Sequence, residues 1–217
     1  MTLRTSCAVF ATVLTRVKQS AAQCVLAAII SVLCMTNAKA VPITYTETAT
    51  VSGSIQAGIL VLLFNNTLLT LTGTGDTTNI ETPDSTHFFN NVTLSFSVAG
   101  SSGTFTNPTS VFSNQNTLVV GFTDETVGTD ILDTSSAAFA SYALSTSIGP
   151  ITGSSAISTG ASFPTSVGTL TLSSAGDATF TAVVTPLPAA LPLFVTGLGA
   201  LGLLGWRRKK KAAALAP

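Results

Sequence analysis

Polar and apolar residues alternate along the middle of the chain with a period of two. Over residues 43–55 every even position is Thr or Ser, and the odd positions are Ile43, Tyr45, Glu47, Ala49, Val51, Gly53 and Ile55. The same alternation recurs over residues 90–98 and 178–184. A period of two is typical of a strand with one buried face. The pattern therefore predicts β-strands in these three segments.

Shorter apolar runs between turn-forming residues predict further strands at 58–64, 68–71, 104–112, 118–123, 139–148 and 170–172. Gly, Pro, Asn, Asp and Ser predict turns at 73–76, 82–84, 100–103, 107–108 and 174–177. No long segment between them has a 3.6-residue period. Residues 41–185 are therefore predicted to form a Ser/Thr-rich, all-β domain, an antiparallel β-sandwich or jelly roll. The alternative is a disordered, glycosylated Ser/Thr-rich stalk, which the regular alternation and the spread of Phe disfavour.

Residues 1–40 have the three parts of a secretory signal peptide. Basic residues come first, at Arg4, Arg16 and Lys18. An apolar run over residues 21–35 follows, and Ala38 and Ala40 then form a small-x-small cleavage pattern. We expect the Sec machinery to export the chain and leader peptidase to cut after Ala40. The alternative is a retained N-terminal anchor.

The C-terminal region, residues 186–217, contains a predicted transmembrane helix. Residues 189–206 carry no charge, and eighteen helical residues span roughly 27 Å, close to the apolar thickness of a bilayer. Cations stay on the cytoplasmic side, so the β domain is predicted to face outward. The cationic cluster consists of Arg207, Arg208, Lys209, Lys210 and Lys211.

A short proline motif precedes this predicted helix and consists of Pro186, Leu187 and Pro188. The order of Pro-x-Pro motif, apolar helix and basic cluster resembles the sorting signal of the PEP-CTERM family. Leu187 stands where the family motif usually has Glu. The resemblance implies recognition by an exosortase, a membrane protease. It also implies an inner-membrane intermediate that is then sorted to the cell surface or the extracellular, exopolysaccharide-containing matrix.

Charge is strongly segregated along the chain. All nine Asp and Glu residues lie between residues 41 and 206, and all nine Lys and Arg residues lie outside that stretch. Binding to nucleic acid is therefore not expected, because phosphate contacts need Lys or Arg. Cys7, Cys24 and Cys34 all precede residue 41, so the β domain has neither disulfide nor thiol chemistry.

Candidates for chemistry are few, and no catalytic residue is predicted. His87 is the one histidine, and no GxSxG motif accompanies it. One polar loop carries four carboxylates, Asp124, Glu125, Asp130 and Asp133. A solvated turn is the simplest interpretation of this loop, and a Ca²⁺ site with oxygen ligands is the alternative. The chain is therefore not expected to be an enzyme or to need a cofactor, with Ca²⁺ as the exception to test.

These features together predict an exported surface or extracellular-matrix protein with a non-enzymatic structural or interaction role. The alternative is a carbohydrate-binding or adhesive β-sandwich module, assisted by Ca²⁺, with exopolysaccharide as its partner. The β domain has only Tyr45 and Tyr142 and no Trp. This poor supply of flat aromatic rings counts against sugar stacking.

Overall fold

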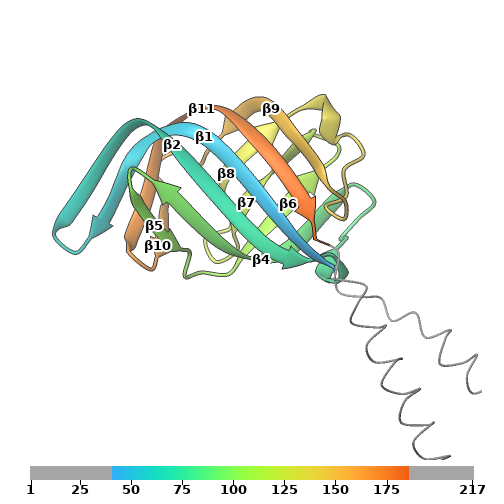
Figure 1. The fold of residues 1–217 in the computed structure, drawn as a ribbon, viewed down its shortest axis with the longest axis horizontal. Helices are drawn as coiled ribbons and strands as arrows, with labels where there is room; N and C mark the ends of the chain where they lie inside the picture. The colour runs from blue at the N-terminus through green and yellow to red at the C-terminus, as the bar shows by residue number, and fades with distance from the viewer. Residues whose placement is uncertain (1–40, 186–217) are drawn as a thin grey trace, which may run out of the picture. The chain divides into compact units, whose positions relative to one another are not determined.

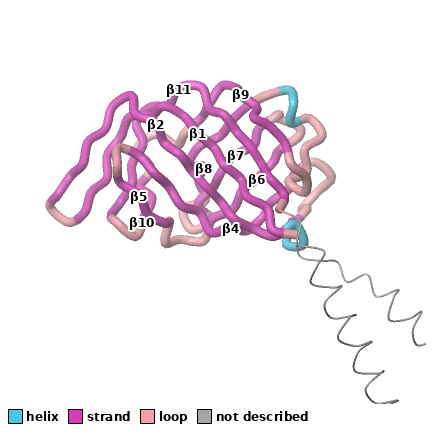
Figure 2. The backbone as a smooth tube through the Cα atoms, viewed as in Figure 1, coloured by secondary structure: helices cyan, strands magenta, loops and turns pink. Residues whose placement is uncertain are grey.

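The computed structural model describes residues 41–185, which form one antiparallel sheet of eleven strands (Figure 1). Two 3₁₀ turns, η1 (Thr77–Asn79) and η2 (Ala137–Phe139), interrupt the strands (Figure 2). The strands are β1 (Pro42–Ala57), β2 (Leu60–Asp76), β3 (Ile80–Glu81), β4 (His87–Val98), β5 (Ser101–Thr104), β6 (Thr109–Asn114), β7 (Val119–Asp124), β8 (Thr129–Ser135), β9 (Ile148–Ala156), β10 (Ser162–Thr165) and β11 (Gly168–Val184).

The sheet closes on itself to form a barrel of eight strands. Neighbouring strands follow the order β1-β2-β4-β6-β7-β8-β9-β11, and β11 pairs back with β1 from Ile43↔Val184 to Gln56↔Thr169. The predicted all-β, antiparallel class is confirmed. The predicted sandwich or jelly roll is not confirmed, because the first and last strands of a single sheet pair with each other. Over the paired length of the strands, closure removes the open edges that two separate sheets would keep.

The alternation in β1 explains which side chains fill the barrel. Ile43, Tyr45, Ala49 and Val51 are buried, while the Thr residues between them lie on the outer surface. In β4 the buried apolar positions are Val92, Leu94, Phe96 and Val98. Branched Thr side chains suit the outer face because their methyl groups fit the pleat and their hydroxyls reach water.

The segment between β8 and β9 contributes to the core, but it is not a strand. Phe139, Tyr142 and Leu144 are buried in it, and the rings of Phe139 and Tyr142 lie 5.8 Å and 6.1 Å from that of Phe180. The Tyr45 hydroxyl donates to the Leu144 carbonyl over 2.7 Å. The predicted strand 139–148 is therefore wrong, except that β9 begins at Ile148. Its apolar residues pack into the barrel from a loop.

Two predicted turns instead lie inside long strands. Residues 73–76 belong to β2, where a Cβ at Gly73 would come within 2.7 Å of the Phe122 ring. Glycine is needed there for close packing rather than for a turn. Residues 174–177 belong to β11, whose register against β1 shifts between Ala49↔Ala178 and Val51↔Ala175. Turn-forming residues here produce a β-bulge.

The two ends of the described chain lie side by side, because the Thr185 N–H donates to the Pro42 carbonyl over 2.8 Å. The hairpin that joins β1 to β2 lies at the other end of these strands, at the left of Figure 1. Near the hairpin, β5 pairs with β4 and β10 pairs with β11. An isolated β-bridge between Phe105, directly after β5, and Thr165, the last residue of β10, links the ends of β5 and β10.

The predicted signal peptide (1–40) and the predicted sorting tail (186–217), with its predicted helix 189–206, lie outside the described residues. Within residues 41–185, no helix has the length and apolar character needed to span a membrane.

The aromatic cluster around Phe180 gives a test of the core. Phe180 is fully buried and packs against Tyr45, Phe139 and Tyr142. Phe180→Ala should lower the free energy of unfolding by about 3–5 kcal/mol in a denaturant titration. Val183→Ala, at a half-exposed position of the same strand, should change it by less than about 0.5 kcal/mol. Equal effects of the two substitutions would contradict this packing.

Candidate functional site

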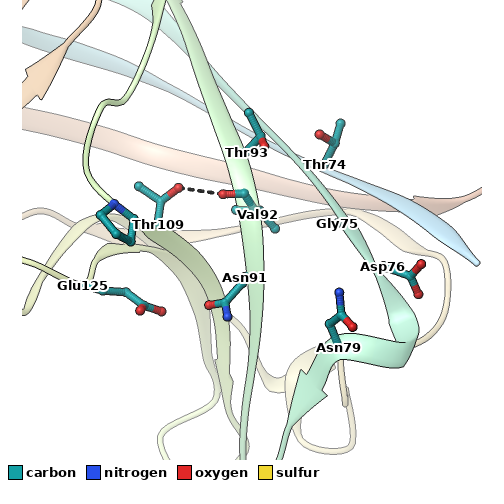
Figure 3. A pocket seen from close by; sticks show the side chains of 10 residues that line it. Thr74, Gly75, Asp76, Asn79, Asn91, Val92, Thr93, Thr109 and Glu125 are labelled. Carbon is teal, nitrogen blue, oxygen red and sulfur yellow. Dashed lines mark hydrogen bonds between the residues drawn. The ribbon is translucent and has the colours of Figure 1, made fainter. Parts of the chain in front are cut away.

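A surface pocket opens where β2 and β4 separate (Figure 3). The last paired residues of these strands are Thr74 and Thr93, after which the chain passes through η1 to β3. The pocket has a volume of about 620 Å³, within the range of small-molecule sites. Its lining consists of Thr74, Gly75, Asp76, Asn79, Asn91, Val92, Thr93, Pro108, Thr109 and Glu125.

The pocket offers hydrogen-bonding groups and negative charge. Asp76 is already engaged, since its Oδ1 atom accepts from the Thr78 N–H (2.8 Å) and hydroxyl (2.7 Å). These bonds lower the pKa of the Asp76 carboxyl. The Thr109 hydroxyl donates to the Val92 carbonyl over 2.9 Å. The side chains of Asn79, Asn91 and Glu125 have no hydrogen-bond partner among residues 41–185 and can meet a polar ligand. Neither aromatic rings nor cations are among the lining residues.

A second polar group is buried in the wall of the barrel. Glu47 and Thr134 face the interior, and Asp133, the neighbour of Thr134 in β8, is also buried. Glu47 is fully buried, and its Oε1 atom accepts from the Thr134 hydroxyl over 2.6 Å. Its Oε2 atom and the Oδ1 atom of Asp133 have no partner among the described residues. No Lys or Arg occurs between residues 41 and 185 to balance these carboxyls.

Burial raises the pKa of both carboxyls, because a low-dielectric interior disfavours the charged form. For Asp133, burial and then the nearby Asp130 raise the pKa to about 8. The pKa of Glu47 is raised well above its usual range, first by burial and then by Asp133, while the bond from Thr134 acts in the opposite direction. The folded protein therefore favours the protonated form of both groups.

The structure assigns Asp124, one of the four predicted Ca²⁺ ligands, to a hairpin turn. Asp124 is buried, and its Oδ1 atom accepts from the backbone N–H groups of Thr126 (2.9 Å) and Val127 (3.0 Å). Its Oδ2 atom accepts from the Asn107 side-chain amide over 2.8 Å. Both oxygens are thus occupied in shaping the turn between β7 and β8.

The other three predicted ligands lie in different surroundings. Glu125 is exposed at the rim of the pocket in Figure 3, Asp130 is half-buried in β8, and Asp133 is buried. Burial raises the pKa of Asp130. Within residues 41–185, no three His, Cys, Asp or Glu side chains are grouped as a metal site requires. The Ca²⁺ site therefore stays a prediction.

His87 lies at the start of β4 beside an acidic turn residue. Its Nδ1 atom is 2.6 Å from Asp84 Oδ2, and both side chains are partly exposed. Asp84 Oδ1 also accepts from the N–H and hydroxyl of Thr86. These bonds, with those from His87, lower the pKa of Asp84. The contacts describe a cap at the β3–β4 turn, and none of them involves a serine hydroxyl.

The remaining predicted site residues lie outside the described part of the chain. They are the cleavage residues Ala38 and Ala40, the motif Pro186, Leu187 and Pro188, and the cluster from Arg207 to Lys211.

Comparison of the chain with protein-family models, curated proteins and solved structures finds no match. Any function must therefore be argued from the residues themselves.

Glu47 was not predicted to be a site residue, although the alternating pattern over residues 43–55 pointed to its burial. Glu47 occupies an odd position of the segment 43–55, and it is the one charged residue among those odd positions. A carboxyl on the inward face of an amphipathic strand predicts a buried ionisable group. The pocket was harder to predict, because it depends on where β2 and β4 separate.

The buried carboxyls predict that stability falls as pH rises. A group whose pKa is higher in the folded than in the unfolded state stabilises most below its unfolded pKa, about 4 for Asp. That contribution is lost as the pH rises through the folded value, about 8 for Asp133. The melting temperature should therefore be lower at pH 9 than at pH 5, by roughly 5 °C or more if the loss is about 2 kcal/mol.

Asp133→Asn should reduce this pH dependence, because the amide does not ionise. Asp177→Asn, at an exposed position of β11, provides the matched control and should keep the wild-type difference. A melting temperature that rises from pH 5 to pH 9 in the wild type would reject the buried, protonated state of these groups.

Proposed function

We propose that the chain is an exported surface or extracellular-matrix protein with a non-enzymatic structural or interaction role, delivered by its C-terminal tail. The observation that carries the proposal is the ordered combination of Pro186–Pro188, the uncharged residues 189–206 and the cations 207–211. The helix would halt translocation and the cations would fix its orientation. The prolines would keep the preceding chain extended, as a protease requires of its substrate.

The position of the barrel in the chain supports this proposal. β11 ends at Val184, two residues before Pro186. A membrane protease acting near Pro186–Pro188 would therefore release the β domain without cutting into a strand. The domain also contains no cysteine, so its folding after export needs no disulfide.

Charge segregation supports the same route. Residues 41–185 carry only acidic charges, and the basic residues lie in the two terminal segments. Basic residues near apolar segments resist translocation, whereas a domain without Lys or Arg has no such signal for retention. The distribution suits a chain whose ends engage the membrane while its middle crosses.

The proline motif gives the sharpest test of sorting. In a host with an exosortase, Pro186→Ala combined with Pro188→Ala should leave the full-length chain in the membrane, because the protease loses its extended substrate. The wild-type chain should lose its tail and appear on the surface or in the matrix, as shown by mass spectrometry of each fraction. Pro192→Ala, within the apolar segment, should be processed normally.

Neutral replacements of Arg207–Lys211 should produce a different defect, namely mixed orientation in the membrane. If the proline double variant is processed like the wild type, or if surface protein retains its C-terminal residues, the tail is a plain anchor and the sorting proposal fails.

The second candidate function is carbohydrate binding, and the pocket in Figure 3 favours it. Its free amides and carboxylate suit neutral hydroxyl groups, and its acidic character opposes anionic ligands. Both tyrosines of the domain are buried, so binding would depend on hydrogen bonds rather than on stacking.

Retention on insoluble cellulose, a neutral polysaccharide, tests this second function. Asn91→Ala and Glu125→Ala should each weaken retention several-fold, because each removes an unpartnered hydrogen-bonding group from the pocket. Asn116→Ala, at an exposed position outside the pocket, should not change it. Unaltered retention of both pocket variants would assign any binding to another surface.

A further inference from the structure

The hairpin between β1 and β2 exposes an unusually apolar strand. Large aliphatic side chains there are exposed over 41% to 99% of their surface. They are Ile59, Leu60, Val61, Leu62, Leu63 and Leu68. Large exposed apolar groups of this kind commonly mark interaction sites. Scattered exposed leucines need no explanation, but a continuous run of this size does.

The apolar run occupies both faces of β2. Successive side chains of a strand point to opposite faces, and residues 60–64 are aliphatic or aromatic without exception. Strands of this composition are typical of positions with neighbours on both faces. At the hairpin, however, only Phe64 among these five residues is buried.

One backbone edge of this segment is also free. Residues Leu60–Phe64 pair with β1 on one side. On the other side β4 pairs with β2 only at Leu69–Thr74, so Leu60–Phe64 has no neighbouring strand there among residues 41–185. Free N–H and C=O groups on an edge strand are a template for another strand. The usual protections of an edge, Lys, Pro or an inward charge, are absent from residues 60–64.

Charge distinguishes between a lipid surface and a second copy of the chain. No Lys or Arg occurs in residues 41–185 to attract anionic headgroups. Unpaired backbone groups cost several kcal/mol each in hydrocarbon, which opposes insertion of an open edge. No charged residue occurs from Thr48 to Gly75, so two hairpins can approach without local repulsion, although the domain as a whole is acidic.

We propose that the β1–β2 hairpin is a self-association surface, in which Leu60–Phe64 of two copies pair edge to edge and antiparallel about a twofold axis. Pairing would satisfy the free backbone groups and cover the aliphatic side chains of both copies, as in β-strand addition. A twofold arrangement makes the contact self-complementary and closed. The proposal does not depend on the sorting tail or its processing.

Sedimentation velocity of the full chain in a non-ionic detergent tests the proposal. The wild type should be dimeric at about 100 µM, where an interface of micromolar affinity is saturated. Val61→Lys and Leu63→Lys should each weaken the dimer at least tenfold. Both side chains are already largely exposed, so the fold should tolerate the lysine, which circular dichroism will check. Val127→Lys, at a half-exposed valine of another turn, is the matched control.

A charge-reversal pair keeps the test independent of any loss of folding. In a twofold antiparallel pairing of Leu60–Phe64, Leu62 faces Leu62 of the other copy. Leu62→Lys and Leu62→Glu chains should therefore each be monomeric alone and should form a mixed dimer when combined. A monomeric wild type, or a dimer that the hairpin substitutions leave unchanged, would overturn the proposal.

Disulfide trapping locates the contact, because residues 41–185 contain no cysteine. In a full chain with Cys7→Ser, Cys24→Ser and Cys34→Ser, oxidation should cross-link copies that carry Leu62→Cys, the position that faces its own copy, more efficiently than copies that carry Val127→Cys. In liposomes, a fluorophore attached through Leu63→Cys should not be quenched by brominated lipid. Strong quenching without cross-linking would identify a membrane-binding hairpin and overturn self-association.

Discussion

The ladder between β1 and β11 is the constraint on which the rest of the structure depends. It pairs residues that lie between 113 and 141 positions apart in sequence, from Gln56↔Thr169 to Ile43↔Val184, and it turns an open sheet into a barrel. Because a strand has a side-chain period of two, this register fixes which face of β1 is inside. A shift by one residue would exchange the Thr and Ser face for the apolar one, so the alternation of β1 and the closure of the barrel specify each other.

The same register has a chemical consequence at Glu47. Its position between Tyr45 and Ala49 forces the carboxyl inside, where Thr134 on the far wall provides one hydrogen bond. Asp133 adds a second carboxyl, and the domain has no Lys or Arg to pair with either. Isolated buried charges are expensive, and protonation removes that cost. The acidic, cation-free composition of the domain therefore couples the stability of the barrel to pH.

The strands could be predicted from sequence far better than their arrangement. Alternation over 43–55, 90–98 and 178–184 identified parts of β1, β4 and β11, because the period of two is a local property. The closure depends on the β1–β11 pairing, which no local pattern contains.

Gly73 and Ser174–Asp177 were assigned to turns, because their composition does not distinguish a turn from close packing or from a bulge. Phe139 and Tyr142 were assigned to a strand because burial in a loop produces a similar spacing of apolar residues. In the candidate site, Glu125 was selected for its charge, whereas the pocket around it depends on the separation of β2 and β4.

The hairpin lies at the opposite end of β1 and β11 from Thr185, the residue before the proposed sorting tail, so the two proposed roles are compatible. The described chain ends at Thr185, bonded to Pro42, while the hairpin lies beyond Gln56 at the other end of β1. A copy held through its C-terminal segment would keep its hairpin free. Restricting copies to a membrane or matrix raises their effective concentration, so even a weak edge-to-edge contact becomes populated. On the proposed route, copies would not be concentrated in this way before export, and the contact would remain largely dissociated. The apolar hairpin would then be tolerated during transit and used at the destination, because the affinity of the strand edge stays constant and only the local concentration changes.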